Sequence, residues 1–159
     1  MQEDACKQHE WLEQLIGEWT FEHEATMPGG EKHEMKGKES YRQLGKLWVV
    51  GELTSPMPDG SDMTAITTLG YDPRQDAFVG NWVGSPMTHM FIYKGQLDES
   101  GKILTLDTSG PGFEDPNTTA EYQDIIEMIS NNERRFYSQV KNPDGSWTRF
   151  MDGTFLRVH

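Results

Sequence analysis

Cysteine is almost absent from this 159-residue chain: Cys6 is the only one, so no disulfide can form within it. A chain of this length can instead be stabilised by one hydrophobic core. The opening segment, MQEDACKQHE, is polar and lacks the apolar stretch of a secretory signal peptide. With so little cysteine, we expect a reducing, cytoplasmic location. No apolar run predicts a membrane-spanning helix.

Positive charge is also scarce, with 14 Lys and Arg against 26 Asp and Glu, a net charge of −12. Nucleic-acid binding requires clustered cationic side chains, so the composition argues against a nucleic-acid partner. Anionic membrane surfaces are disfavoured for the same reason. The general expectation is that this charge keeps the protein soluble.

Motifs for metals and common cofactors are missing as well. The sequence contains no H-x-x-x-H, H-E-x-x-H or C-x-x-C spacing, no glycine-rich phosphate loop and no G-x-S-x-G. A haem ligand on a late strand would have to be His159, the terminal residue, where fraying makes a poor axial ligand. We therefore predict no metal and no cofactor. The five histidines are His9, His23, His33, His89 and His159.

Hydrophobic periodicity predicts one helix over about 5–16. Asp4 is the expected cap, Gly17 ends the helix, and the apolar residues 11, 12, 15 and 16 share one face. From Trp19 the period becomes two, which is typical of half-buried strands. Turn residues separate ten such segments, at about 19–27, 33–44, 47–54, 63–71, 77–84, 88–97, 102–108, 119–129, 133–141 and 146–158.

Ten short strands with short connections must pair mostly as antiparallel neighbours, because parallel crossovers need a dozen or more residues. Closing the sheet removes its exposed edges. We therefore predict one all-β domain over 1–159, an up-and-down barrel of about ten strands (about 18–158) with a short N-terminal helix. A two-sheet sandwich is the main structural alternative.

The first hairpin allows a prediction of register. Matching the apolar faces pairs Met27 with His33 around a five-residue loop, which places His23 opposite Gly37 and Trp19 opposite Tyr41. A slip of one residue would turn the charged face inward.

The triplet Gly17-Glu18-Trp19, which follows a helix and opens the first strand, resembles the G-x-W signature of lipocalins and calycins. The resemblance implies that Trp19 closes one barrel end and that Arg157, in the last strand, packs across it. More of the chain, at 15–19 (LIGEW), 70–72 (GYD), 78–82 (FVGNW), 93–95 (YKG) and 101–106 (GKILTL), is similar to the family called domain of unknown function 1579. That likeness implies a lipocalin-like barrel and no activity, so it carries over no catalytic residue.

Several polar and aromatic side chains are expected to line the barrel interior. His23 and Glu39 are predicted to be diagonal neighbours, with Tyr41 on the same face and Gly37 leaving room beside His23. Such a group could be a self-satisfied polar network, a ligand contact or an acid–base set. Trp82 lies in a strand where Phe78, Gly80 and Gly84 share its face, a pattern that makes either a concavity or ordinary packing. His89 and Tyr93 share a face with Phe91, but the opposite face is equally apolar, so its direction stays open.

Two charged segments have simple interpretations. Glu133-Arg134-Arg135 is expected to be a solvated strand start, and the loop carboxylates Glu114 and Asp115 are expected to face water.

The leading hypothesis is therefore a non-enzymatic module that binds a small apolar or amphipathic molecule inside the barrel. The site residues would be His23, Glu39, Tyr41, Trp82, His89 and Tyr93. One alternative is a calycin-type enzyme that uses the interior His, Glu and Tyr on a small acid. Another is an interaction protein, a possible homodimer.

Overall fold

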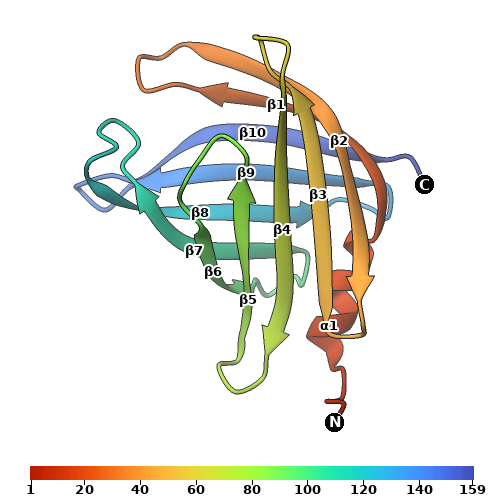
Figure 1. Ribbon diagram of the computed structural model, residues 1–159. Coiled ribbons are helices and arrows are strands. Elements are labelled where there is room, and N and C mark those ends of the chain that lie inside the picture. Colours follow the sequence, from red (N-terminus) through yellow and green to blue (C-terminus); the bar gives the residue numbers. More distant parts are fainter.

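The computed structural model describes residues 1–159, and its ten strands form one closed antiparallel barrel (Figure 1). Each strand pairs with the next in sequence, and β1 pairs with β10, which confirms the up-and-down barrel and excludes a two-sheet sandwich. The strands are β1 (Gly17–Thr26), β2 (Lys32–Leu44), β3 (Trp48–Pro56), β4 (Asp62–Asp72), β5 (Ala77–Gly84), β6 (Phe91–Leu97), β7 (Ile103–Pro111), β8 (Thr119–Met128), β9 (Glu133–Lys141) and β10 (Trp147–Arg157).

The strands wind strongly around the barrel. In Figure 1, β3 and β4 run steeply while β8, β9 and β10 cross behind them at a large angle. The strands agree with the sequence patterns to within a few residues, except that β6 begins at Phe91 rather than at residue 88, and β7 continues to Pro111. His89 lies just before β6. It contacts β7 through a hydrogen bond of its side chain and not through backbone pairing.

The helical segment is shorter than predicted. It consists of α1 (Lys7–Leu12) and the 3₁₀ helix η1 (Glu13–Leu15). The predicted cap at Asp4 is wrong, because the helix begins two residues later with Cys6 as N-cap. The Cys6 backbone N–H donates to Nδ1 of His9 at 2.9 Å, which satisfies a donor that the helix itself leaves unpaired. Neither helical segment has the length and apolar composition needed to cross a lipid bilayer.

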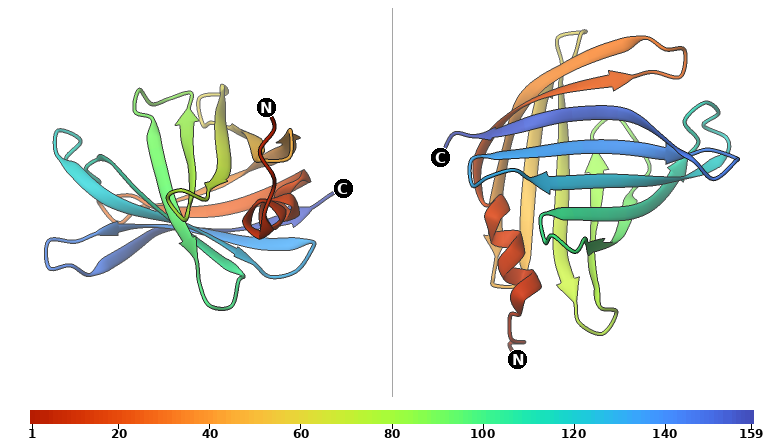
Figure 2. Two further views of the ribbon diagram at one scale, coloured as in Figure 1. Left: turned by 90° about the horizontal axis from the view of Figure 1, so that it is seen from below. Right: turned by 180° about the vertical axis from the view of Figure 1, so that it is seen from behind.

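This helix closes one end of the barrel (Figure 2). Leu12 and Leu15 are fully buried in the same core cluster as Trp19. At the edge of this contact, Nε1 of Trp11 donates to the carbonyl of Gly101, in the β6–β7 turn, at 2.7 Å. A helix this short is marginal alone, so these contacts must hold it in place.

The first hairpin has the predicted inner face but a different register. Trp19 pairs with Glu39, Phe21 with Gly37 and His23 with Met35, a shift of two residues from the predicted pairs. The reason is a tighter loop. The Met27 N–H donates to the carbonyl of Glu31, so three residues rather than five form the turn. Gly30 supplies the left-handed conformation that such a turn needs (φ 90°). Met27, predicted to face inward, is 39% exposed beside this turn.

Several glycines lie directly opposite aromatic residues, whose rings cover them. A Cβ added to Gly51 would lie 2.5 Å from the ring of Tyr41, and one added to Gly153 would lie 1.9 Å from the ring of His23. The room expected at Gly37 is likewise filled, here by the ring of Phe21. The absence of a side chain at these glycines therefore allows aromatic rings to pack against the strand backbone, and it does not enlarge the cavity.

The same holds for β5, where small and large residues alternate. A Cβ at Gly84 would meet the Trp82 ring at 2.4 Å, and one at Gly80 would lie 1.9 Å from the Thr68 carbonyl oxygen of β4. The β5 glycines are thus required for close packing.

We predict that Gly80→Ala costs about 1–3 kcal/mol of the free energy of unfolding, because the rigid β4 backbone must move. Gly29→Ala is the matched control, since nothing lies within 4 Å of its Cβ position, and it should change stability by less than about 1 kcal/mol. Urea unfolding of both variants measures the difference, and equal stabilities would contradict the packing role of Gly80.

Candidate functional site

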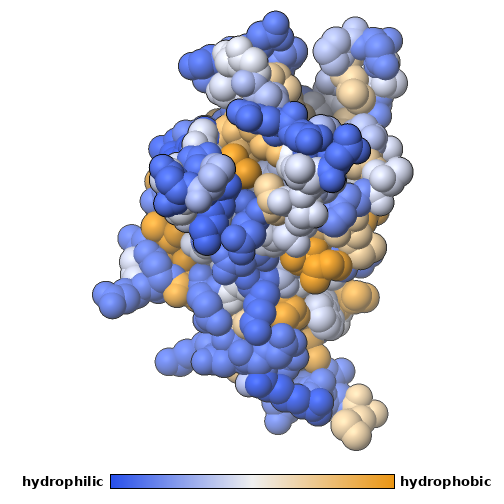
Figure 3. All heavy atoms as spheres, turned by 90° about the vertical axis from the view of Figure 1, so that its left-hand side faces the viewer, coloured by the Kyte–Doolittle hydropathy of each residue, from blue (hydrophilic) through white to orange (hydrophobic).

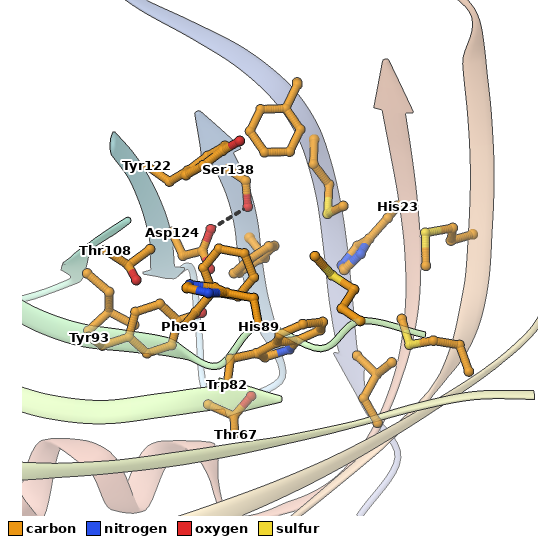
Figure 4. A pocket seen from close by; sticks show the side chains of 18 of the residues that line it. His23, Thr67, Trp82, His89, Phe91, Tyr93, Thr108, Tyr122, Asp124 and Ser138 are labelled. Carbon is orange, nitrogen blue, oxygen red and sulfur yellow. Dashed lines mark hydrogen bonds between the residues drawn. The ribbon is translucent and has the colours of Figure 1, made fainter. Parts of the chain in front are cut away.

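The barrel encloses a cavity of about 650 Å³ lined by thirty residues, seventeen of them hydrophobic (Figure 4). This volume lies within the range of small-molecule sites. The structure places all six sequence-predicted site residues in its wall: His23, Glu39, Tyr41, Trp82, His89 and Tyr93.

The cavity opens at the barrel end opposite the helix. Met87, Thr88, Phe113 and Pro116, in the β5–β6 and β7–β8 loops, form part of its lining. Figure 3 views this side of the molecule and shows hydrophobic atoms exposed between hydrophilic loops. Four methionines also line the cavity, and their flexible thioether chains can adapt to guests of different shape. They are Met35, Met63, Met87 and Met151.

Trp19 lies at the floor of the barrel, and two arginines lie over its indole ring. The guanidinium carbons of Arg134 and Arg157 are 4.7 and 4.2 Å from the ring centroid. The indole N–H donates to the Leu15 carbonyl at 2.8 Å. Arg157 donates to the carbonyls of Gln14 and Ile16, which the end of the helix leaves free. These contacts join the helix, β1 and β10 at the closed end.

Arg134 is a cavity residue that the sequence analysis missed. Far from being solvated, its side chain is 2% exposed and forms a buried ion pair with Glu39. Strand alternation carries the missed signal, because Arg134 shares its parity with Phe136 and Ser138, which also line the cavity. The guanidinium lies 3.7 Å from the centroid of the Phe155 ring.

Burial dominates the electrostatics of this floor. It raises the pKa of the Glu39 carboxyl, while the neighbouring Arg134 charge opposes that rise. Burial, reinforced by the Glu39 carboxylate, also raises the pKa of Tyr41. A buried pair of this kind is stable only with both partners present, since either charge alone would be uncompensated.

His23 does not pair with Glu39, so the predicted diagonal contact is wrong. The two-residue change in register separates them, and Glu39 is held by Arg134 instead. His23 is 7% exposed, stacks against Phe136 with ring centroids 5.6 Å apart, and leaves its Nε2 without a hydrogen-bond partner. Burial, with a smaller effect of the Arg134 charge, lowers the pKa of His23 to about 4, so the ring is neutral near pH 7.

A second polar group, on the other side of the cavity, was also missed. Asp124 of β8 accepts hydrogen bonds from the hydroxyls of Tyr93 and Ser138, the latter at 2.6 Å. Burial raises the pKa of the Asp124 carboxyl, although both hydroxyls act in the opposite direction. Strand alternation carries the missed signal, because Asp124 shares its parity with the apolar residues Tyr122 and Ile126, which also line the cavity.

The face of β6 that the sequence left open is now assigned. His89, Phe91 and Tyr93 line the cavity, whereas Met90 and Ile92 are 49% and 60% exposed. His89 contacts the edge of Phe91, and its Nε2 lies 2.9 Å from the Ser109 carbonyl oxygen of β7.

The site contains no group of three or more His, Cys, Asp or Glu side chains placed to hold a metal ion. What the cavity offers is an apolar and aromatic wall, a charge-paired floor and a few hydrogen-bonding atoms, an arrangement suited to orienting a small guest.

Comparison with protein families matches residues 4–157 to the family described as protein of unknown function (DUF1579). The chain belongs to this family. The match spans the helix and almost the whole barrel of this DUF1579 chain. No curated protein matches its sequence.

Two solved structures share the fold of this DUF1579 protein. Rv2717c from M. tuberculosis superposes with a TM-score of 0.68 and 15% identity, covering 98% of this chain and 100% of that one. The S-type phycobiliprotein lyase CPES from Guillardia theta superposes with a TM-score of 0.66 and 13% identity, covering 94% and 92%. At these identities the likeness shows the barrel fold alone.

We predict that Glu39→Leu and Arg134→Met each lower the free energy of unfolding by about 3–5 kcal/mol, because each strands a buried charge. The double variant should lose clearly less than the sum, since it strands neither. Urea unfolding of the four proteins gives the coupling energy. Additivity within about 0.5 kcal/mol would mean that the pair is not coupled.

We also predict a pH dependence that comes from His23. Its folded pKa of about 4 lies below the ordinary 6.5, so the unfolded chain takes up this proton first as the pH falls. The associated stability, about 3 kcal/mol, is therefore present above pH 6.5 and is lost between 6.5 and 4. His23→Gln should flatten that part of the stability profile, whereas His33→Gln, at an exposed site, should leave it unchanged. Identical profiles for His23→Gln and the native chain would contradict this assignment.

Proposed function

We propose that this protein binds a small apolar or amphipathic molecule inside the barrel. The observation that carries the proposal is a 650 Å³ cavity with a mostly apolar wall and a few polar side chains, among them His23, Thr108 and Asp124. A cavity of this size, mostly apolar with a few polar groups, is the usual form of a small-molecule site.

The wall supports an aromatic or flat guest. The rings of Trp82 and Phe91 meet edge to face with centroids 5.9 Å apart, and Phe91 meets Tyr122 at 6.2 Å. Aromatic side chains supply large contact areas in fixed orientations. The flexible side chains of the four methionines can adjust the shape of the wall to the ligand.

The geometry favours binding over catalysis. The acid–base hypothesis needs His23 and Glu39 to act together, but Glu39 is paired with Arg134 at the floor and His23 stands among phenylalanine rings. The size and the apolar lining of the cavity indicate a small apolar or amphipathic ligand.

The proposal predicts that the neutral apolar dye Nile red binds in the cavity and gains fluorescence. Thr108→Trp should weaken this binding about tenfold or more, because the larger side chain fills the space that the dye needs. Ile92→Trp is the matched control, since Ile92 is 60% exposed on the outer face of the neighbouring strand. Fluorescence titration measures both variants, and circular dichroism checks that each is folded.

Equal affinities of the native chain and Thr108→Trp, with Ile92→Trp weakened instead, would place the dye outside the barrel and contradict the proposal. Failure of Nile red to bind the native chain at all would also count against an accessible cavity.

A further inference from the structure

We infer that the guest is a cation: an amphipathic amine or amidine whose charged group pairs with Asp124 inside the barrel. The inference rests on the proposed function and names the ligand class for the same cavity.

Asp124 is an interior carboxylate without a cationic partner. Its hydrogen bonds come only from the neutral hydroxyls of Tyr93 and Ser138, and it takes part in no salt bridge. Interior charges are normally paired, because removing a charge from water is costly. Each oxygen of Asp124 retains a lone pair that a ligand N–H can occupy. A charge-assisted hydrogen bond there would be stronger than one between neutral groups.

Arg134, the cavity's cation, is already neutralised. Its guanidinium pairs with Glu39 and is covered by the rings of Trp19 and Phe155. An anionic guest would therefore have to compete with Glu39 for a covered group. With the Arg134–Glu39 pair neutral and His23 uncharged near pH 7, Asp124 is the cavity's remaining carboxyl group.

The mouth has the same sign of charge as Asp124. The loops at the open end, residues 27–31, 57–61, 85–90, 112–118 and 142–146, contain five carboxylates and no Lys or Arg. These carboxylates belong to Glu31, Asp59, Glu114, Asp115 and Asp144. Like charges gathered around a cleft raise the local concentration of oppositely charged ligands and speed their association.

A shallower hollow beside the mouth continues this negative surface. It contains Glu114, Asp115 and Asp144 and shares Phe113 and Phe150 with the cavity. Its two cationic residues are already paired, Lys141 with Glu121 at 3.4 Å and Arg149 with Asp152 at 3.5 Å. A cation approaching this hollow meets carboxylates without salt-bridge partners.

The surroundings of Asp124 also suit a cation with an apolar body. Figure 4 shows Asp124 pointing into the space that Phe91, Tyr122 and Ser138 border. Aromatic faces attract cations, and more so where water is excluded.

Three probes with one naphthyl skeleton test the inference: naphthylmethylamine, naphthylmethanol and naphthoate, titrated calorimetrically into the native chain. We expect the amine to bind about tenfold more tightly than the alcohol, and the carboxylate to bind more weakly than either. Asp124→Asn should reduce the preference for the amine to less than about twofold. Asp107→Asn, which removes the same charge from the exposed face of β7, should leave that preference unchanged.

Equal affinities for the three probes would overturn the cationic class while leaving the binding function intact. Tightest binding of the carboxylate would overturn it in favour of a guest that reaches Arg134. A preference for the amine that survives in Asp124→Asn would overturn the role of Asp124. Failure of all three probes and of Nile red would overturn the binding function itself.

The mouth can be tested without altering the cavity. In Glu31→Gln/Glu114→Gln, the association rate of the amine should fall severalfold by stopped-flow, while that of the alcohol stays the same. This measurement tests the preference for a cation independently of whether Asp124→Asn folds. An unchanged amine rate would contradict the steering role of the loops.

Discussion

The buried ion pair between Arg134 and Glu39 determines what the rest of the barrel interior can hold. It joins β9 to β2 across the floor, and its guanidinium packs against the rings of Trp19 and Phe155. Because the two charges compensate one another, the floor carries no net charge. Arg157 also packs against the Trp19 ring and donates hydrogen bonds to the backbone carbonyls of Gln14 and Ile16 at the end of the helix. The barrel is thus closed at one end by contacts within the chain.

Because one end of the barrel is closed, a ligand can enter the cavity only from the opposite end. Above the floor, rings and methionines form the wall, and the polar side chains among them include His23, Thr108 and Asp124, whose carboxylate oxygens keep free lone pairs. Glycines opposite aromatic residues do not create this space. They allow the rings of Phe21, His23 and Tyr41 to lie against the barrel wall, so the cavity remains in the centre. The negative mouth and the interior carboxylate then favour the same kind of guest.

Much of this arrangement could be predicted from strand alternation. The period of two in β1 and β2 placed His23, Glu39 and Tyr41 on the inner face, because a strand with one buried face tolerates no slip of one residue. A slip of two residues keeps that face, so the pattern could not choose the register, and the three-residue turn at Gly30 decided it. Arg134 was missed because a charged residue was expected to be solvated, although strand alternation places it on the same face as Phe136 and Ser138. Asp124 was missed for the same reason: its parity with Tyr122 and Ile126 places it on the inner face, but a lone carboxylate among apolar residues was not assigned to that face.

The central claim is that the barrel interior receives a guest, and methionine methyl resonances report on it directly. In a solution NMR titration with Nile red, the methyl groups of the cavity residues Met35, Met63 and Met151 should shift together and saturate at one equivalent. Those of Met57 and Met90, which do not line the cavity, should stay in place. Shifts confined to Met57 and Met90, or scattered without saturation, would show surface adsorption and contradict a guest inside the barrel.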